Sequence, residues 1–251
     1  MPPGFHGDTA SNPLSQILKV EAPPTWTERS LPAEKQCDEG ACRCNREVFE
    51  NVYVGAEDDP TRVPWGDGLP SPSLVAWLNR DACQLVRPGA RTVVIGCGLG
   101  EDVAELARRG FGVMGFDCSH TAARWAARRY PALSDRFLQA DLFNLPPRLL
   151  ARFDLAIEIN TIDCVEPSLR PHAARGISRL LTHRGVALVV CRGASSDDPL
   201  CEVGGPPYAI EPAELQQLLE QAGLSVVGDV TPFFGGHQAE GPRLRGVFRR
   251  L

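Results

Sequence analysis

The sequence predicts an α/β protein with a mostly parallel sheet and helices on both of its faces. Residues 92–119 form an apolar strand, a glycine turn, an amphipathic helix and a second strand that ends in Asp117. The alternation of apolar strands and helices then repeats along the chain. With 251 residues, of which 43% are hydrophobic, the chain is long enough to bury one large α/β core as a single domain.

The glycine turn has the chemistry of a nucleotide-binding element. Glycines in the turn 96–100 let the chain reverse sharply and let a ligand approach the backbone closely. The helix that follows directs unpaired N–H groups toward the turn. Glu101 and Asp102 in the first helical turn disfavour a pyrophosphate, whereas Asp117 can accept hydrogen bonds from both hydroxyls of a ribose. The turn therefore favours a nucleoside with an amino-acid tail over a dinucleotide.

The spacing of the glycines separates several nucleotide-binding motifs. The turn reads G-x-G-x-G, and the third glycine of a dinucleotide fingerprint would stand at position 101, which is Glu101. A nicotinamide oxidoreductase is therefore disfavoured. A P-loop is excluded because no Gly-Lys-Ser/Thr follows the turn. A plain tight connection is the other interpretation of such a turn, and the second strand ending in Asp117 counts against it.

The run GCGLGEDVAELARRGFGVMGFDCS resembles motif I and the following acidic position of class I S-adenosylmethionine-dependent methyltransferases. It is especially similar to the thiopurine S-methyltransferase-like branch, which tolerates an apolar residue at the place of Val94. The resemblance covers about residues 26–251. It implies a Rossmann-like class I methyltransferase fold, with a seven-stranded, mostly parallel sheet and an antiparallel last strand. It also implies S-adenosylmethionine as cofactor.

The chain before the glycine turn is expected to form an arm and a loop. Residues 1–46 are interpreted as an N-terminal arm, either flexible or folded as a lid over the active site, and residues 47–251 as the methyltransferase domain. Prolines and glycines predict an ordered loop over residues 47–72. The P-W-x-x-G-x-P run of this loop resembles a family segment over the cofactor, which implies that Trp65 packs near the sulfonium or the methionine tail. A Trp that only caps the core is the alternative.

Apolar periodicity predicts the remaining elements in order. Seven strands are expected at residues 93–95, up to 117, and at 136–139, 153–159, 186–192, 224–230 and 244–250, the last two forming a terminal hairpin. Helices are expected at residues 73–85, 101–109, 121–130 and 212–222. A further helix is expected to continue over residues 175–181, and the run 166–171 resembles the family segment that opens it.

The exit of the third strand carries an acidic residue followed by apolar ones. In class I methyltransferases such an acid bonds the adenine amino group while apolar neighbours enclose the ring, and the resemblance assigns these roles to Asp141 and its neighbours Leu142 and Phe143. An Asp that caps the following loop is the alternative. Together, the motifs assign cofactor binding to Trp65, Gly96, Cys97, Gly98, Gly100, Asp117, Cys118, Asp141, Leu142 and Glu158.

Three residues are candidates for a general base. Methyl transfer by direct displacement needs alignment and a dry site, and an alcohol or amine acceptor also needs a base. Glu158 ends a central strand beside the point where ligands bind in open α/β sheets. Asp163 follows in the same loop, and His237 lies before the last strand. A solvated surface histidine is the alternative for His237.

Nine cysteines are scattered along the chain, several of them in predicted core strands. This distribution suits a reducing compartment and implies no disulfide framework. Cys37, Cys42 and Cys44 lie close together in the sequence, but paired C-x-x-C spacing and a fourth ligand are missing. We therefore expect no metal site.

The resemblance implies an enzyme that methylates a small molecule, most often at a thiol sulfur. N- or O-methylation, a soft-element acceptor such as arsenite or tellurite, and a non-catalytic S-adenosylmethionine-binding module are the alternatives. The net charge of −5 provides no basic field for nucleic acid, and no apolar run reaches the length of a membrane span. We expect a cytoplasmic monomer or weak homodimer, with no nucleic-acid or membrane partner.

Overall fold

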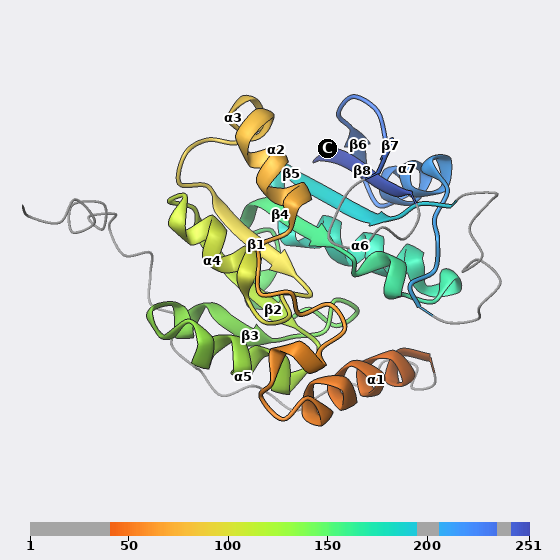
Figure 1. Ribbon diagram of the computed structural model, residues 1–251. Helices are drawn as coiled ribbons and strands as arrows, with labels where there is room; N and C mark the ends of the chain where they lie inside the picture. The colour runs from red at the N-terminus through yellow and green to blue at the C-terminus, as the bar shows by residue number, and fades with distance from the viewer. Residues whose placement is uncertain (1–40, 195–205, 235–241) are drawn as a thin grey trace, which may run out of the picture. The chain divides into compact units, whose positions relative to one another are not determined.

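The computed structural model describes residues 41–194, 206–234 and 242–251. In these ranges eight strands form one sheet in the order β3-β2-β1-β4-β5-β8-β6, and the short β7 pairs with β8 (Figure 1). Strands β1 to β5 are parallel, and β8 runs antiparallel to β5. The predicted fold class is confirmed. The strands are β1 Arg91–Ile95, β2 Gly112–Asp117, β3 Phe137–Gln139, β4 Phe153–Ile159, β5 Leu181–Arg192, β6 Leu224–Val226, β7 Thr231–Phe233 and β8 Arg243–Arg250.

The helices bury their apolar sides against the strands. The face of the sheet that carries Leu155 and Ile157 packs against α2, α3 and α4, with Trp77 and Leu106 fully buried. The α6 helix packs against β4 and β5, and α7 packs against β6 and β8 (Figure 1). The helices are α1 Ala41–Gly55, α2 Pro72–Arg80, α3 Ala82–Leu85, α4 Glu101–Arg108, α5 His120–Arg129, α6 Arg170–Leu180 and α7 Pro212–Gln221.

The register of the central strands brings the predicted site residues to one edge of the sheet. Ile95, the last residue of β1, lies beside Phe116 on one side and beside Glu158 on the other. The chain crosses from β1 to β2 in one direction and reaches β4 in the other, so the topological switch point lies between β1 and β4. The glycine turn and Glu158 therefore meet where open α/β sheets bind their ligands.

Several predicted elements differ from the observed ones. The sheet has eight strands where seven were expected, and β5 begins at Leu181, five residues before its predicted start, with an irregularity in its pairing to β4. The loop expected over residues 47–72 is wrong for its first part, because α1 continues to Gly55 and the prolines that exclude a helix begin only at Pro60. The helix expected at 73–85 is divided at Asp81, whose φ of −113° departs from the α-helical value of about −63°. The strand expected at 224–230 ends at Val226, because Gly228 has a left-handed φ of 78°, and β7 follows separately.

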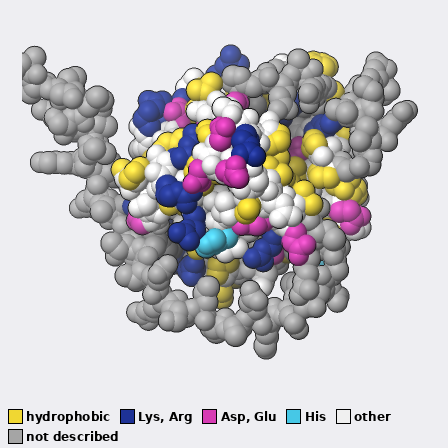
Figure 2. Space-filling model, turned by 60° about the horizontal axis from the view of Figure 1, so that its bottom comes forward, with side chains coloured by type: hydrophobic (Ala, Val, Ile, Leu, Met, Phe, Trp, Pro, Cys, Tyr) yellow, Lys and Arg dark blue, Asp and Glu magenta, His cyan; other side chains and the backbone are white. Residues whose placement is uncertain are grey.

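The described residues all belong to one compact unit. Helix α1 runs across the domain boundary expected at residue 46, and the division of the chain there stays a prediction. Figure 2 shows basic and acidic side chains side by side on one face of the molecule. Among the helices in the described ranges, none has both the length and the apolar character that crossing a bilayer requires.

Candidate functional site

The glycine turn is tightly packed by neighbours that leave no room for side chains. Gly96 and Gly98 have left-handed φ values of 61° and 49°, which other residues rarely adopt. A Cβ at Gly96 would lie 2.3 Å from Thr161 Oγ1, and a Cβ at Gly98 would lie 3.1 Å from the hydroxyl oxygen of Tyr53. Both positions therefore require glycine, for the backbone conformation and for the space.

Asp117 connects the end of β2 to the glycine turn. Its Oδ2 accepts a hydrogen bond from the Gly98 N–H at 2.9 Å, and its Oδ1 accepts one from the Ser119 N–H at 2.9 Å. Burial raises the pKa of Asp117 above its ordinary value, against the effect of these two bonds. Each carboxylate oxygen has a second lone pair, so the group can still accept hydrogen bonds from a diol.

Three aromatic side chains pack together, and one of them, Tyr53, lies against the glycine turn at Gly98. Tyr53, on α1, is 3% exposed, and its hydroxyl accepts a hydrogen bond from Trp65 Nε1 at 2.8 Å. The rings of Phe49 and Tyr53 both meet the Trp65 ring edge to face. Trp65 remains 43% exposed. The loop that carries Trp65 is thus attached to α1 beside the turn, and the contact of Trp65 with a cofactor stays a prediction.

Glu158 and Asp163 form a buried carboxylate pair at the carboxyl end of β4. Glu158 is fully buried, and its Oε1 accepts hydrogen bonds from the N–H groups of Thr161 at 2.7 Å and Ile162 at 2.9 Å. Asp163 Oδ2 accepts one from the Arg192 N–H at 2.7 Å. Within the described ranges, the other oxygen of each carboxylate has no hydrogen-bond partner. Both of these oxygens are buried and can carry a proton.

The pair holds its protons more tightly than exposed carboxylates do. Burial, and then the charge of Asp163, raise the pKa of Glu158 to about 8. Burial also raises the pKa of Asp163. Arg243, at the start of β8, lies close enough to oppose both shifts, and its guanidinium donates to Asn160 Oδ1. At neutral pH this site can therefore hold or accept a proton.

Four other residues predicted to bind the cofactor, Cys97, Cys118, Asp141 and Leu142, have surroundings that are common in protein cores and loops. The Cys97 side chain packs against β2 at Gly115, and its N–H donates to the Phe116 carbonyl. Burial raises the pKa of the Cys118 thiol. Asp141 Oδ1 accepts from the Phe143 N–H at 2.8 Å, which is the contact of a loop-capping Asp. Leu142 is buried, with its carbonyl against α6. Their roles toward a cofactor stay predictions.

Some predicted residues cannot be placed. His237 and Cys37 lie outside the described residues, and of Cys42 and Cys44 only the backbone, in α1, is described. Within the described ranges, no three His, Cys, Asp or Glu side chains are arranged so that they could hold a metal ion.

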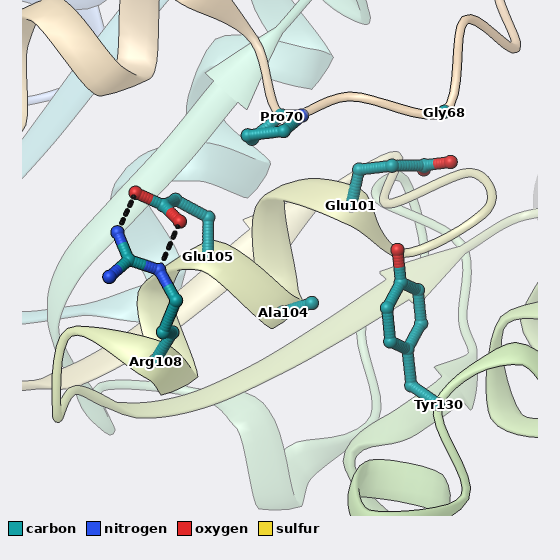
Figure 3. Close-up of a pocket in the computed structure, with 7 residues that line it drawn as sticks. All are labelled: Gly68, Pro70, Glu101, Ala104, Glu105, Arg108 and Tyr130. Atoms are coloured by element: carbon teal, nitrogen blue, oxygen red, sulfur yellow. Dashed lines mark hydrogen bonds and ion pairs between the residues drawn. The ribbon is translucent and has the colours of Figure 1, made fainter. Parts of the chain in front are cut away.

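A shallow hollow of about 160 Å³ lies on one side of α4 and is separate from this site. Figure 3 shows the loop with Gly68 and Pro70 on one side of it, the paired Glu105 and Arg108 at one end and the Tyr130 ring at the other. None of its lining residues is among those predicted to bind the cofactor. The lining residues are Gly68, Pro70, Glu101, Ala104, Glu105, Arg108 and Tyr130.

Four residues at or beside this site were not predicted from the sequence: Glu50, which accepts a hydrogen bond from Ser119 Oγ, and Tyr53, Thr161 and Arg243. A helical signal near the first two was present, because Phe49 and Tyr53 stand four residues apart and so share a helix face. Thr161 and Arg243 reach the site only through the packing of β4 against β1 and of β8 against β5, which no local pattern reveals.

The family model of thiopurine S-methyltransferase matches residues 60–231, which is more than half of the chain. The chain belongs to the thiopurine S-methyltransferase family. It is therefore an S-adenosylmethionine-dependent methyltransferase. The residues fit this cofactor, because Asp117 stands beside the glycine turn with lone pairs that can accept hydrogen bonds from a ribose.

The names of similar proteins describe methyl acceptors that contain sulfur. A probable thiol methyltransferase 2 from Arabidopsis thaliana is 29% identical, over 79% of this chain and 84% of its own. A thiocyanate methyltransferase 1 from Brassica oleracea is 29% identical, over 66% of this chain and 70% of its own. A thiopurine S-methyltransferase from Xanthobacter autotrophicus is 28% identical, over 60% of this chain and 76% of its own.

Solved structures share the fold. A structure from work on the conversion of a disulfide bond into a thioacetal group during echinomycin biosynthesis has a TM-score of 0.66 and 25% identity, covering 82% of this chain and 92% of its own. The 1,6-didemethyltoxoflavin N1-methyltransferase of Burkholderia thailandensis, with bound S-adenosylhomocysteine, has a TM-score of 0.65 and 18% identity, covering 88% of this chain and 93% of its own. The second likeness concerns the fold alone.

Proposed function

We propose that this enzyme transfers the methyl group of S-adenosylmethionine to the thiol sulfur of a small molecule. The observation that carries the proposal is the free, buried oxygen of Glu158, whose carboxyl has a pKa of about 8 and lies next to the glycine turn. A thiol has an ordinary pKa of about 8.5, so a proton passes between the two groups with little change in free energy. The names of the thiol, thiocyanate and thiopurine methyltransferases support sulfur as the accepting atom.

The proposed reaction is a direct displacement. The acceptor thiol gives its proton to the ionised Glu158, and its sulfur forms a bond to the methyl carbon while the bond from that carbon to the sulfonium sulfur breaks. The products are S-adenosylhomocysteine and a methyl thioether. The cofactor supplies an already activated methyl group, so the protein contributes alignment, exclusion of water and the base. Asp163 acts on Glu158 through its charge, and His237 stays a candidate on the acceptor side.

The cofactor site that we propose lies over the carboxyl ends of β1, β2 and β3. The backbone of the glycine turn would face the methionine tail, and Asp117 would hold the ribose. Asp141 and Leu142 would meet the adenine, and Trp65 would lie near the sulfonium, where an aromatic face stabilises positive charge. Cys97, between Gly96 and Gly98, and Cys118, directly after Asp117, would line the site. Glu158 would close it on the β4 side.

We also propose a cytoplasmic enzyme that acts as a monomer or weak homodimer, without nucleic-acid or membrane partners. Free buried thiols such as Cys97 and Cys191 suit a reducing compartment. The net charge of −5 offers no attraction for nucleic acid. The segment 1–46 is proposed as an arm that serves as a lid over the active site.

A matched set of acceptors tests the accepting atom. Thiophenol, phenol and aniline present sulfur, oxygen and nitrogen on the same ring. We expect the purified enzyme with S-adenosylmethionine to form S-adenosylhomocysteine and a methylated product with thiophenol alone. Methylation of only phenol or aniline would contradict the choice of sulfur. Cofactor binding without transfer to any of many acceptors would instead favour a non-catalytic binding module.

A further inference from the structure

Helix α1 places a carboxylate against the N-terminus of α5. Glu50 Oε2 accepts a hydrogen bond from Ser119 Oγ at 2.7 Å and from the Thr121 N–H at 3.3 Å, and Glu50 Oε1 accepts one from Thr121 Oγ1 at 2.5 Å. The first N–H groups of a helix have no partner within the helix, and the helix dipole favours a negative charge there. Glu50 therefore binds α5 by three hydrogen bonds from a distant part of the chain.

The charge of Glu50 is maintained by these contacts. Burial acts to raise the pKa of Glu50, but the hydrogen bonds from Thr121 and Ser119 prevail and lower it below the ordinary value. The side chain is thus ionised at neutral pH, and its hydrogen bonds are of the stronger, charge-assisted kind.

Ser119 connects Glu50 to Asp117. The Ser119 hydroxyl has a single proton, which it donates to Glu50, while its oxygen accepts from the Ala122 N–H at 2.9 Å as the N-cap of α5. The Ser119 N–H donates to Asp117 Oδ1 at 2.9 Å. Because Glu50 and the N-cap contact fix the Ser119 side chain, they also fix the Ser119 backbone. Glu50 therefore helps to position the Ser119 N–H group, which donates to Asp117.

A second contact from the same helix reaches the other side of Asp117. Tyr53, less than one helical turn from Glu50, packs its hydroxyl against Gly98, whose N–H donates to Asp117 Oδ2. Helix α1 therefore supports both backbone donors that hold the Asp117 carboxylate. An ordinary helix cap would account for the bonds to α5, but not for this second contact at the glycine turn.

We propose that Glu50 is a positioning residue for the cofactor, which fixes the Asp117 carboxylate through Ser119 and makes cofactor binding depend on the docking of α1. The proposal rests on the assignment of Asp117 to the cofactor under the proposed function. A residue that only stabilised the fold would change the free energy of unfolding and leave the affinity for the cofactor unchanged.

The test compares Glu50→Gln with Glu47→Gln, which lies on the exposed side of the same helix. The glutamine amide has an NH2 group, which cannot accept, in place of one carboxylate oxygen, and it has no charge, so it cannot keep all three hydrogen bonds from Ser119 and Thr121. We expect the Kd for S-adenosylhomocysteine, measured by calorimetry, to rise about tenfold in Glu50→Gln, as for a lost bond to a charged group. We expect the KM for S-adenosylmethionine to rise in parallel at an unchanged kcat, and Glu47→Gln to match the wild-type protein in all three.

A double-mutant cycle tests the route through Ser119. In the Ser119→Ala background, the Glu50→Gln change is expected to weaken binding by much less than it does in the wild-type protein. An equal loss in both backgrounds would contradict the route. A wild-type Kd in Glu50→Gln, even with a lower free energy of unfolding, would overturn the proposal.

Two further measurements test the proposal if Glu50→Gln does not fold, and separate its failure from a failure of the proposed function. If Glu50→Gln does not fold, Thr121→Val removes one donor to Glu50 without altering α1, and it is expected to raise the Kd by about threefold, as for the loss of one of several bonds. An unchanged Kd in Thr121→Val would then overturn the proposal. Failure of the wild-type protein to bind S-adenosylhomocysteine would overturn the proposed function itself, whereas equal binding by wild type and variants would overturn only the role of Glu50.

Discussion

Single residues at the end of β4 carry the proposed chemistry. Glu158 combines complete burial with two backbone hydrogen bonds to one oxygen and, among the residues that the structure describes, none to the other. Its position was predictable, because an acidic residue that ends a buried strand faces the ligand edge of an open sheet. Its pairing with Asp163 and the nearness of Arg243 were not predictable, since they depend on how the following loop and β8 fold back.

Replacing Glu158 by Gln tests the base directly. The pKa of about 8 predicts that kcat/KM of the wild-type enzyme rises with pH until Glu158 is ionised, and then levels off. Glu158→Gln cannot accept the proton, so we expect kcat/KM at pH 8 to fall by about 100-fold and to lose this dependence. Glu166→Gln, which changes a partly exposed carboxylate eight residues further along the chain, is the control. A variant that kept the wild-type pH profile would contradict the assignment.

The same residue makes a prediction about stability. The pKa of Glu158 is raised from 4.5 in the unfolded chain to about 8 in the folded protein, so folding takes up a proton between these values. Its contribution to stability is complete below pH 4.5 and is lost as the pH rises through 8. Urea denaturation should therefore show a decline of stability in this window that is absent in Glu158→Gln.

At the scale of elements, β1 and β4 are held in register by a charged contact at their N-terminal ends. Asp154, in β4, accepts hydrogen bonds from the backbone N–H and the guanidinium of Arg91, in β1, and from Arg87. Because β1 and β4 are parallel neighbours, a contact that fixes their register also fixes which residues lie side by side at their other ends, where the end of β1 before the glycine turn lies beside Glu158.

Removing this charge should weaken the fold at moderate pH. Burial acts to raise the pKa of Asp154, but the bonds from Arg91 prevail and lower it to about 2. Its contribution is present above the unfolded pKa of 3.8 and is lost as the pH falls toward 2. Since Arg91 is half exposed, we expect Asp154→Asn to lower the free energy of unfolding at pH 7 by about 1 kcal/mol.

The predicted loss of stability is checked by urea denaturation of the wild-type protein, of Asp154→Asn and of Asp229→Asn, an exposed control. The difference between wild type and Asp154→Asn should shrink as the pH approaches 2. A difference of the same size at neutral and at acid pH, or none at neutral pH, would contradict the role of the charge.

The elements that the sequence predicted well are those with a strong local period. The helices α4 and α5 agree with their predicted ranges within about one residue and the strand β1 within about two, and β2 ends at Asp117 as predicted. Helix α1 was missed over residues 47–55 because the proline-rich stretch after it was extended back too far. Glu50 and Tyr53 were missed with it, although they support the backbone donors on both sides of Asp117.

At the scale of the whole molecule, the order of the strands brings together residues from distant parts of the chain. The alternation of strands and helices predicted a parallel sheet, and the family resemblance predicted its antiparallel last strand. The insertion of β8 between β5 and β6 depends on pairing that no short pattern encodes. That insertion places Arg243 near Glu158, so the site is completed by the C-terminal strand.

The first measurement to make is a calorimetric titration of the wild-type protein and Asp117→Ala with S-adenosylmethionine and S-adenosylhomocysteine, with NADH as control. We predict that wild type binds both adenosyl ligands and not NADH, and that Asp117→Ala binds neither. Absence of binding to the wild-type protein, or binding to Asp117→Ala with unchanged affinity, would contradict the placement of the cofactor at the glycine turn.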